Sequence, residues 1–497
     1  MLAETAIFLA LDADPDFRPA ATRLAAARAT AVESFDPGDM GALAARLRRD
    51  PPKRMILVVR PQTIDVEWAH RLLEVATGVD EDPFLDVPYG LVTGRDPAAA
   101  VRFAERVVAS SRGSAARTAG LFGSWEGPVA PTGQPLPALA SLGFDATHAY
   151  VLTSAAKESR DTQAREALER MAGRGLCLFF SHGYPDRMEA CFTAEELRRS
   201  GVRLDGTVLV NCACFNGCPG RWWAPGPQGM QAMPPPAPEA SVALELLDRG
   251  VAAYVAGVDA WHGPLAMQMA MHLADDGATL GDAQACMVNR LAMEMAPQRN
   301  SFAPVEQRKF AGEGPENRRF NAAAMVVYGD PGWAPFAEGA PRNARAALVD
   351  PATGRMELTL APPVKGMPGA DAMLTQSQLL DYFSVRSPDV MREAAFELHR
   401  AVPWPEPLPP APALRVVKAE CGDQPLPTGP VQAMVESRPD GRWLQVRVPL
   451  AVRAYGSTWL LGLGAKGATI VLTPEPAAPP GAAAPAAAPA PEQRPAP

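Results

Sequence analysis

Three cysteines lie close together in the segment VLVNCACFNGCPG, directly after an apolar run that is typical of a buried β-strand. Cys212, Cys214 and Cys218 could bind zinc, pack in a core as small apolar groups, or include a nucleophilic thiolate. Zinc sites usually take ligands at C-x₂₋₄-C spacing and need four of them, and no second cluster in the sequence completes the set. Taken alone, the cysteines favour core packing, so a catalytic hypothesis depends on other residues.

A histidine ends the apolar run before this one. The segment GLCLFFSHGYPD is typical of a strand that ends in His182 followed by Gly183. Two adjacent parallel strands would deliver this imidazole and a thiol to the same edge of one sheet. A cysteine peptidase needs that pair, because the imidazole activates the thiolate while backbone N–H groups face the developing oxyanion. Glycine after the histidine lets a substrate carbonyl approach the backbone. The matched strand ends therefore favour catalysis.

The elements that must position these residues alternate between strands and helices. In the first third, TAIFLALDA and RMILVVRP are short apolar runs, while EWAHRLLEVATG and DPAAAVRFAERVVAS have helical periodicity. The middle third repeats the pattern with more strongly apolar runs. This alternation predicts an α/β fold, with helices packed on the faces of a parallel sheet.

From about residue 340 the pattern changes to β-hairpins. ALVDPATGRMELTLA and GPVQAMVESRPDGRWLQVRVPL each place turn residues between alternating runs, which predicts an antiparallel sandwich. Between them, SPDVMREAAFELHRAV has helical periodicity, with Ser387 as N-cap and Pro388 in the first turn. The Ala/Pro-rich residues 474–497 are expected to form a disordered tail.

These segments resemble the caspase-like cysteine peptidases, and within them the gingipain family. FFSHG and NCACFNG are similar to the family's histidine and cysteine motifs, and VVYGDPGW is similar to its closing Gly-Asp-Pro segment. The likeness covers roughly residues 50–338. It implies a catalytic dyad of His182 and Cys214, with an oxyanion hole formed by the N–H groups of Gly183 and Cys214.

Two further segments come in the family's order. LFGSWEG falls where gingipains place a glutamate that orients the histidine, which implies this role for Glu126. VAGVDAWHGP falls where they place an aromatic lid over the specificity pocket, which implies this role for Trp261. The acid that gingipains use to hold a basic substrate side chain has no counterpart in GPVAPTGQPLPALA, so Asp259 is the alternative; it could equally cap the next segment. Trp222 and Trp223 could line the substrate groove or pack in the core.

Composition excludes several other classes of protein. A formal net charge of −8 with both signs mixed argues against a nucleic-acid platform, and no apolar stretch reaches the roughly 20 residues that cross a membrane. Seven cysteines, an odd number in a long chain, indicate a reducing, cytoplasmic setting rather than a disulfide scaffold. The opening MLAETAIFLALDADPD is typical of a strand and not of a signal peptide. The acidic segment DEDPFLD lacks the ligand spacing of a calcium loop, and no metal or other cofactor is expected.

The expected organisation has four parts. Residues 1–118 and 119–338 would be the N-terminal and catalytic subdomains of a caspase-like parallel-sheet sandwich. Residues 339–473 would form an immunoglobulin-like β domain with a helical insertion, and residues 474–497 the disordered tail.

The resulting hypothesis is a cysteine endopeptidase that acts on a protein or peptide substrate through a thioester intermediate, with its oligomeric state open. Cys214 would attack the scissile carbonyl, and His182 would act as general acid–base. Two alternatives remain. One is a catalytically inactive caspase-like protein that binds peptides or serves as a scaffold. The other is a structural zinc-binding protein that uses the cysteine cluster.

Overall fold

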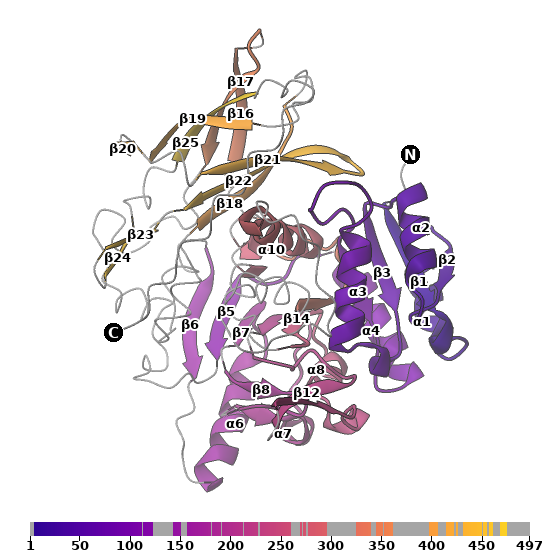
Figure 1. The fold of residues 1–497 in the computed structure, drawn as a ribbon. Helices are drawn as coiled ribbons and strands as arrows, with labels where there is room; N and C mark the ends of the chain where they lie inside the picture. The colour runs from indigo at the N-terminus through magenta and orange to yellow at the C-terminus, as the bar shows by residue number, and fades with distance from the viewer. Residues whose placement is uncertain are drawn as a thin grey trace.

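Figure 1 shows the fold of the 497-residue chain as a computed structural model. The structure describes residues 4–111, 113–122, 143–150, 157–179, 181–189, 191–211, 213–226, 229–259, 269–270, 272–274, 277–295, 325–338, 344–350, 352–360, 397–405, 414–421, 424–425, 431–449, 451–454, 457–460 and 468–474. The predicted tail after Pro474 lies outside these residues, as do Glu126, Cys212 and Trp261.

A ten-stranded sheet forms the centre of the molecule. Its strands, in spatial order, are β2 (Val32–Phe35), β1 (Thr5–Ala10), β3 (Arg54–Val58), β4 (Tyr89–Val92), β15 (Met325–Tyr328), β14 (Ala253–Gly257), β11 (Val208–Asn211), β7 (Leu176–Phe179), β5 (Thr118–Phe122) and β6 (Asp145–Tyr150). The first four strands in this order run parallel to one another, and so do the last five. The predicted α/β fold with a mainly parallel sheet is confirmed.

Strand β15 marks the junction between two halves of this sheet, because it pairs antiparallel with β14, with Val255 opposite Val327. We call β2, β1, β3, β4 and β15 the first half, and β14, β11, β7, β5 and β6 the second half. Strands β3, β7, β11 and β14 are buried along almost their whole length, as expected for strands covered on both faces. The halves therefore share one continuous core.

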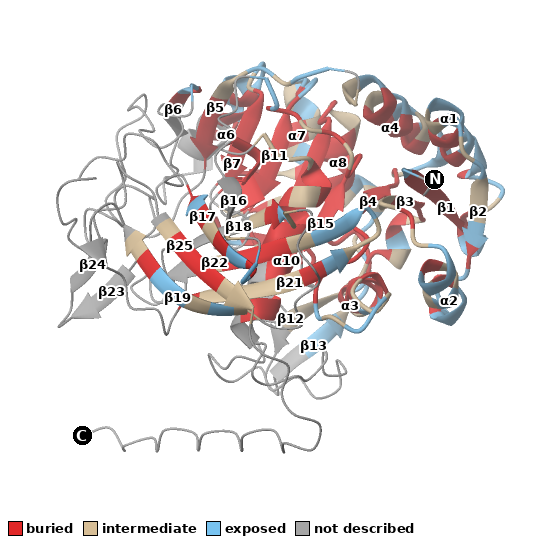
Figure 2. Cartoon of the chain, turned by 90° about the horizontal axis from the view of Figure 1, so that it is seen from above, coloured by how far each residue is buried: buried red, intermediate tan, exposed pale blue. Residues whose placement is uncertain are grey.

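Helices cover both faces of the sheet (Figure 2). One layer contains α1 (Arg18–Arg28), α4 (Pro97–Ser110), α8 (Val242–Asp248), α7 (Ala194–Ser200) and α6 (Lys157–Met171). The opposite face carries α2 (Gly41–Arg49), α3 (Val66–Ala76) and α10 (Leu280–Met295). Side-chain caps begin several of these helices; for example, Asp96 accepts a hydrogen bond of 2.7 Å from the N–H of Ala99 at the start of α4.

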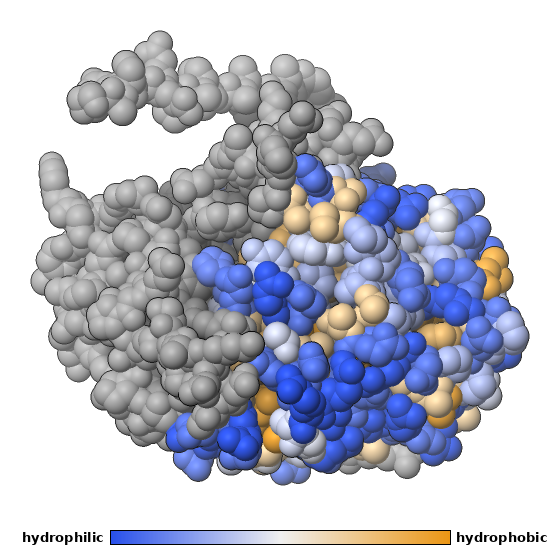
Figure 3. Space-filling view, turned by 90° about the horizontal axis from the view of Figure 1, so that it is seen from below, coloured by the Kyte–Doolittle hydropathy of each residue, from blue (hydrophilic) through white to orange (hydrophobic). Residues whose placement is uncertain are grey.

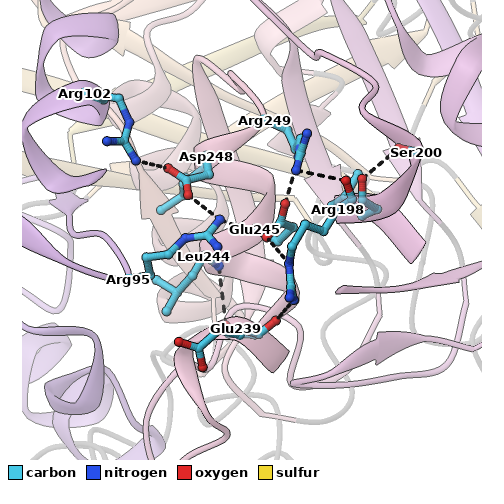
Figure 4. Close-up of polar contacts among 12 residues, drawn as sticks. Arg95, Arg102, Arg198, Ser200, Glu239, Leu244, Glu245, Asp248 and Arg249 are labelled. Atoms are coloured by element: carbon cyan, nitrogen blue, oxygen red, sulfur yellow. Dashed lines mark hydrogen bonds and ion pairs between the residues drawn. The ribbon is translucent and has the colours of Figure 1, made fainter. Parts of the chain in front are cut away.

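A buried ion-pair network joins the two halves through the first helical layer (Figure 4). At its centre is Glu245 of α8, whose side chain is 1% exposed. Its carboxylate oxygens lie 2.9 Å from Arg95, 3.3 Å from Arg198 and 2.8 Å from Arg249. Arg95 precedes α4 in the first half, whereas Arg198 belongs to α7 in the second half. Glu245 therefore neutralises arginines from both halves at one point.

Polar contacts hold the segment that follows β15 against the rest of the fold. Asp330 is buried and forms an ion pair with Arg28 of α1, while it also accepts a 2.9 Å hydrogen bond from the N–H of Gly332. Trp333 donates through Nε1 to the carbonyl oxygen of Gly113 at 2.8 Å. Gly329 has a φ of 135°, a backbone conformation that favours glycine. The Gly-Asp-Pro motif therefore has a structural role at the end of a central strand.

The described C-terminal residues form two larger antiparallel sheets and a two-stranded one, β23 (Ala451–Ala454) with β24 (Ser457–Leu460). One larger sheet is ordered β16 (Ala344–Asp350), β17 (Arg355–Leu360), β25 (Ala468–Pro474), β19 (Leu414–Cys421) and β20 (Gln424–Pro425); the other is ordered β18 (Glu397–Pro403), β22 (Gly441–Pro449) and β21 (Gln432–Arg438). The two larger sheets bury a shared apolar cluster that includes Leu358, Leu444 and Ile470. Both predicted hairpins are confirmed, as β16–β17 and as β21–β22.

One prediction in this part is wrong in its final residues. The segment expected to be a helix from Ser387 ends in strand β18, whose residues Glu397–Pro403 pair with β22. The physical reason is tertiary: these residues complete a sheet edge, and pairing with a long neighbouring strand outweighs a weak helical preference. The earlier residues of that segment lie outside the described part of the chain.

Candidate active site

The register of β7 and β11 brings the candidate histidine and cysteine to one edge of the sheet. These strands pair in parallel, with Phe179 opposite Asn211. His182 and Cys214 each follow that pair by three residues, at the carboxyl ends of the strands. Strand β14 lies on the other side of β11, and Asp259 comes two residues after its end. Three of the predicted site residues thus follow three neighbouring strand ends.

The segments after β7 and β11 are in direct contact. A Cβ atom built at Gly183 would lie 2.8 Å from the Cβ of Ala213 and 2.9 Å from the carbonyl oxygen of Cys214. Real Cβ atoms do not approach other atoms this closely, so only glycine fits next to the cysteine segment. His182 is exposed and Cys214 partly exposed, so both can be reached from solvent.

Two buried asparagines hold the cysteine loop, residues 213–221, in this position. Asn216 donates through Nδ2 to the carbonyl oxygens of Tyr184 and of Arg187, the latter at 2.9 Å. Asn211 accepts a 2.7 Å bond from the N–H of Ala213 and donates to Asn216 Oδ1 at 3.1 Å. Because Asn211 and Asn216 have no exposed surface, each lost bond would leave a buried polar group without a partner. The asparagines therefore fix the histidine segment relative to the cysteine segment.

Two buried tyrosines support the same loop from the sheet. Tyr254 of β14 donates to the carbonyl oxygen of Asn216 at 3.3 Å, and Tyr328 of β15 donates to that of Gly217 at 2.6 Å. Burial raises the pKa of both phenols above the ordinary value, so they remain protonated donors. In the same loop, Phe215 has a φ of 57°, an uncommon left-handed conformation for a residue other than glycine. The chain therefore turns sharply directly after Cys214.

A short hairpin follows the candidate histidine. Strands β8 (Gly183–Tyr184) and β9 (Arg187–Met188) pair across a two-residue turn, and the N–H of Glu189 donates to the carbonyl oxygen of His182 at 2.9 Å. In this register Gly183 and Met188 form a non-hydrogen-bonded pair, so the N–H of Gly183 is directed away from β9. The first residues of two helices hold this turn. The carbonyl oxygen of Asp186 accepts a hydrogen bond from the N–H of the first residue of α7, and the carbonyl oxygen of Pro185 accepts one from the N–H of the first residue of α8.

Cys218 has a different environment from Cys214. It is fully buried, and its Sγ lies 3.4 Å from the carbonyl oxygen of Arg221 and 3.6 Å from that of Ile64. Burial, followed by the negative charge of Asp65, raises the pKa of the Cys218 thiol well above its ordinary value. A neutral, enclosed thiol is a poor nucleophile. Cys218 instead anchors the far end of the cysteine loop to the segment that follows β3.

The structure places some predicted site residues and leaves others outside the described residues. Asp259 is 5% exposed, and its carbonyl oxygen accepts a 3.3 Å bond from the N–H of Phe215, so it lies against the cysteine loop. Glu126, Trp261 and Cys212 are outside the described residues, so their roles stay predictions. Sequence reasoning missed Asn211, Asn216 and the two tyrosines. For Asn211 and the two tyrosines, the available signal was a polar side chain in an otherwise apolar strand segment: VLVN, VAAYVAG and MVVYGD.

A cluster of carboxylates lies away from this site, in the loop between α3 and β4. Within the described residues it is the one group of three metal-type ligands: Asp80, Asp82 and Asp86 offer oxygens within 4.8 Å of one another. Burial, then the charges of its acidic neighbours, raises the pKa of Asp86 to about 8, and burial raises that of Asp82 to about 6. Asp82 accepts a 2.8 Å hydrogen bond from the N–H of Ser437, so the cluster contacts the C-terminal sheets.

In the part of the chain that the structure describes, no helix is long and apolar enough to span a bilayer. The face in Figure 3 is mostly hydrophilic where it is described, with apolar residues in small separate spots.

Comparison with known proteins gives distant structural matches. One is the complex of the pro- and mature domains of RgpB from Porphyromonas gingivalis, with 11% sequence identity and a TM-score of 0.42, covering 72% of this chain and 86% of that chain. Another, described as "Structure of Protease", has 11% identity and a TM-score of 0.44, covering 73% of this chain and 86% of that chain. No protein-family model matches the sequence, and a search of curated proteins gave no match. These values assign neither a family nor an activity.

Proposed function

We propose that this protein is a caspase-like cysteine endopeptidase of gingipain type, with Cys214 as nucleophile and His182 as general acid–base. The observation that carries the proposal is the register of β7 and β11, together with the close approach of Gly183 to the backbone of Cys214. A thiol and an imidazole at neighbouring strand ends, both accessible to solvent, meet the basic requirement for nucleophilic catalysis by cysteine.

The reaction would proceed in two stages. The thiolate of Cys214 attacks the scissile carbonyl carbon, and the resulting oxyanion is stabilised by the N–H groups of Gly183 and Cys214. Protonated His182 gives its proton to the leaving amine as the C–N bond breaks, which leaves a thioester. His182 then removes a proton from water, the hydroxyl attacks the thioester, and the thiolate of Cys214 leaves. Pre-positioned N–H groups matter because they stabilise charge that develops only in the transition state.

Support for the oxyanion hole comes from the hairpin register. The N–H of Gly183 is directed away from its partner strand, and the missing side chain leaves room for a substrate carbonyl. Asn216 links this hairpin to the cysteine loop, so the two N–H groups belong to one hydrogen-bonded unit. Such rigidity is what a catalytic site requires, because small displacements of the reacting groups are costly.

The test combines hydrolysis with labelling of the thiol. Wild-type protein is incubated with a mixed library of fluorogenic peptides, and then with iodoacetamide before peptide mapping by mass spectrometry. We expect Cys214→Ala and His182→Ala to lower hydrolysis by about 10³-fold or more with folding intact. Cys218→Ala keeps most of the activity, and alkylation of the wild type is fastest at Cys214. If Cys214→Ala hydrolyses peptides as fast as the wild type, the proposal is wrong.

Two further measurements separate the alternatives. Peptide binding without hydrolysis by the folded wild type would favour an inactive, peptide-binding protein. Stoichiometric zinc in purified protein, with a melting temperature that falls on chelation, would favour the structural zinc hypothesis.

A further inference from the structure

An aromatic surface flanks both candidate catalytic residues. Tyr184 lies two residues after His182, and Phe215 directly follows Cys214. Trp222 of β12 (Trp222–Gly226) contacts both: its ring centre lies 5.8 Å from that of Tyr184 and 5.6 Å from that of Phe215. Both contacts are edge-to-face, the arrangement that aromatic pairs prefer. We call Tyr184, Phe215 and Trp222 the aromatic wall.

The three rings differ in how much surface they leave open. Phe215 is 5% exposed and anchors the wall in the core, whereas Tyr184 and Trp222 are partly exposed. Arg187, the cross-strand partner of Tyr184, places its guanidinium carbon 4.2 Å from the centre of the Tyr184 ring. This cation–π contact fixes the orientation of the phenol ring. The wall is therefore ordered yet accessible.

Its position along the hairpin matches the path of a bound peptide. His182 directly precedes β8 and Tyr184 is the second residue of that strand, so the two residues lie roughly 7 Å apart along an extended chain. About two residues of an extended peptide cover the same distance. A substrate whose scissile carbonyl meets Cys214 and Gly183 would therefore place a neighbouring side chain against Trp222 and Tyr184.

We propose that the aromatic wall is a substrate subsite that selects peptides with an aromatic or large aliphatic side chain within two residues of the bond that is cut. The inference rests on the proposed function for the cut, although the binding preference itself does not require hydrolysis. The partly exposed rings of Trp222 and Tyr184 favour apolar and aromatic groups, because burial of such groups removes apolar surface from water. Its three residues differ from Asp259 and Trp261, which the sequence analysis assigns to the specificity pocket.

The experiment uses pairs of peptides that differ only by Phe against Ala at one position near the cleavage point. Binding to the full-length Cys214→Ala protein is measured by calorimetry, and hydrolysis by the wild type as kcat/KM. We expect at least one position where Phe is favoured about 10-fold or more in both measurements, as for a well-filled apolar pocket. Trp222→Ala should reduce the Phe-to-Ala ratio to near 1 in both measurements. It should change the affinity and the kcat/KM of the Ala peptides by less than about 3-fold.

Trp223 offers a matched control on the same strand. Adjacent residues of a strand point to opposite faces, so Trp223 does not share the face of Trp222, and Trp223→Ala should keep the Phe preference. Since Trp222→Ala could disturb folding, Tyr184→Leu serves as a second variant, which removes one ring but keeps an apolar side chain. It should lower the preference for the Phe peptide over the Ala peptide. The preference for a peptide with Leu at that position should not change. Equal binding of Phe and Ala peptides, or a preference that survives both variants, overturns the inference. Selective binding without hydrolysis supports the subsite and contradicts only the proposed function.

Discussion

The two halves of the central sheet use the ends of their strands in opposite ways. In the first half, polar residues after the strands cap helices: Asp65 accepts a 2.9 Å bond from Trp68 N–H at the start of α3, and Asp96 does the same for α4. In the second half, the chain after β7 and β11 enters tight loops instead, and His182 and Cys214 remain accessible.

This difference shows how one architecture produces both a scaffold and a site. A helix that begins at a strand end takes up the polar side chain there, because its first N–H groups need acceptors. A tight loop has no such demand, and here Asn211 and Asn216 satisfy the backbone groups of the loops. The asparagines therefore hold the loops that carry the reactive side chains.

The largest expected effect on stability comes from a change in the ion-pair network that joins the two halves. Glu245→Gln removes the negative charge that faces three arginines, two of them about one-fifth exposed at 20% and 19%. Breaking a buried ion pair by removal of one partner costs about 3–5 kcal/mol, so we expect the free energy of unfolding in urea to fall by that amount. Glu195→Gln is the control, because Glu195 and its partner Arg199 are each 68% exposed and such pairs contribute under about 1 kcal/mol. A loss below about 1 kcal/mol for Glu245→Gln would contradict the network's role.

The next effect is on the second half alone. Asn216→Ala removes the side-chain donor to the carbonyl oxygens of Tyr184 and Arg187, which we expect to cost about 2–3 kcal/mol of stability. Activity should fall more than stability predicts, by about 100-fold in kcat/KM, since the histidine and cysteine segments lose their common anchor. Peptide hydrolysis and urea unfolding are measured together. Asn216→Asp keeps the size but removes the donors, and wild-type activity in that variant would show that the bonds are dispensable.

A smaller effect should appear as a pH dependence of stability that arises in the first half. The pKa of Asp86 is raised to about 8 by burial and by its acidic neighbours, against about 3.9 in an unfolded chain. Between these values the folded state holds a proton that the unfolded state has lost, so stability falls as pH rises from about 4 to about 8.

Asp86→Asn keeps the shape of the side chain and abolishes this titration. We expect the variant to be more stable than the wild type at pH 8. The slope of its free energy of unfolding against pH should be smaller by up to about 1.4 kcal/mol per pH unit. Urea unfolding at several pH values measures this. Asp50→Asn, at a carboxylate that is 60% exposed, is the control. An unchanged slope in Asp86→Asn would assign the pH dependence to other groups.

The smallest effect tests the first half by itself. Asp96→Ala removes the cap of α4 and should cost about 1 kcal/mol, visible as a small fall in melting temperature. Peptide hydrolysis should be unchanged, because this residue lies in the first half and is not among the groups that hold the cysteine loop. A large loss of activity with little loss of stability would contradict the division of labour between the halves.

Much of the fold could be predicted from the sequence because its signals are local. Apolar runs such as VLVN and LCLF identify buried strands, and the turn at Pro439 and Asp440 identifies the β21–β22 hairpin. The order of strands across the sheet could not be predicted, since pairing between distant segments leaves little trace in periodicity. Strand β18 was missed for a related reason: its helical pattern was overruled by pairing with β22.

For the candidate site, sequence patterns supplied the reactive residues but not what holds them. His182 and Cys214 stand out because reactive side chains at strand ends are rare among apolar runs. Asn216 does not stand out, because its partners Tyr184 and Arg187 are about thirty residues away and its bonds go to backbone groups that every residue carries. The left-handed conformation of Phe215 has no sequence signal either, since such positions usually contain glycine or asparagine.

The position of β15 has a consequence for how the chain folds during synthesis. β15 contains residues Met325–Tyr328, yet it lies between β4 and β14, which both precede it in the chain. The two halves therefore have no direct strand pairing until the ribosome has released more than 328 residues, long after most of either half has been made. Non-local pairing of this kind is slow, and strand edges that are still unpaired are prone to aggregation. A nascent chain stalled before Met325 would consist of two half-sheets with β4 and β14 both uncovered, a natural substrate for chaperones.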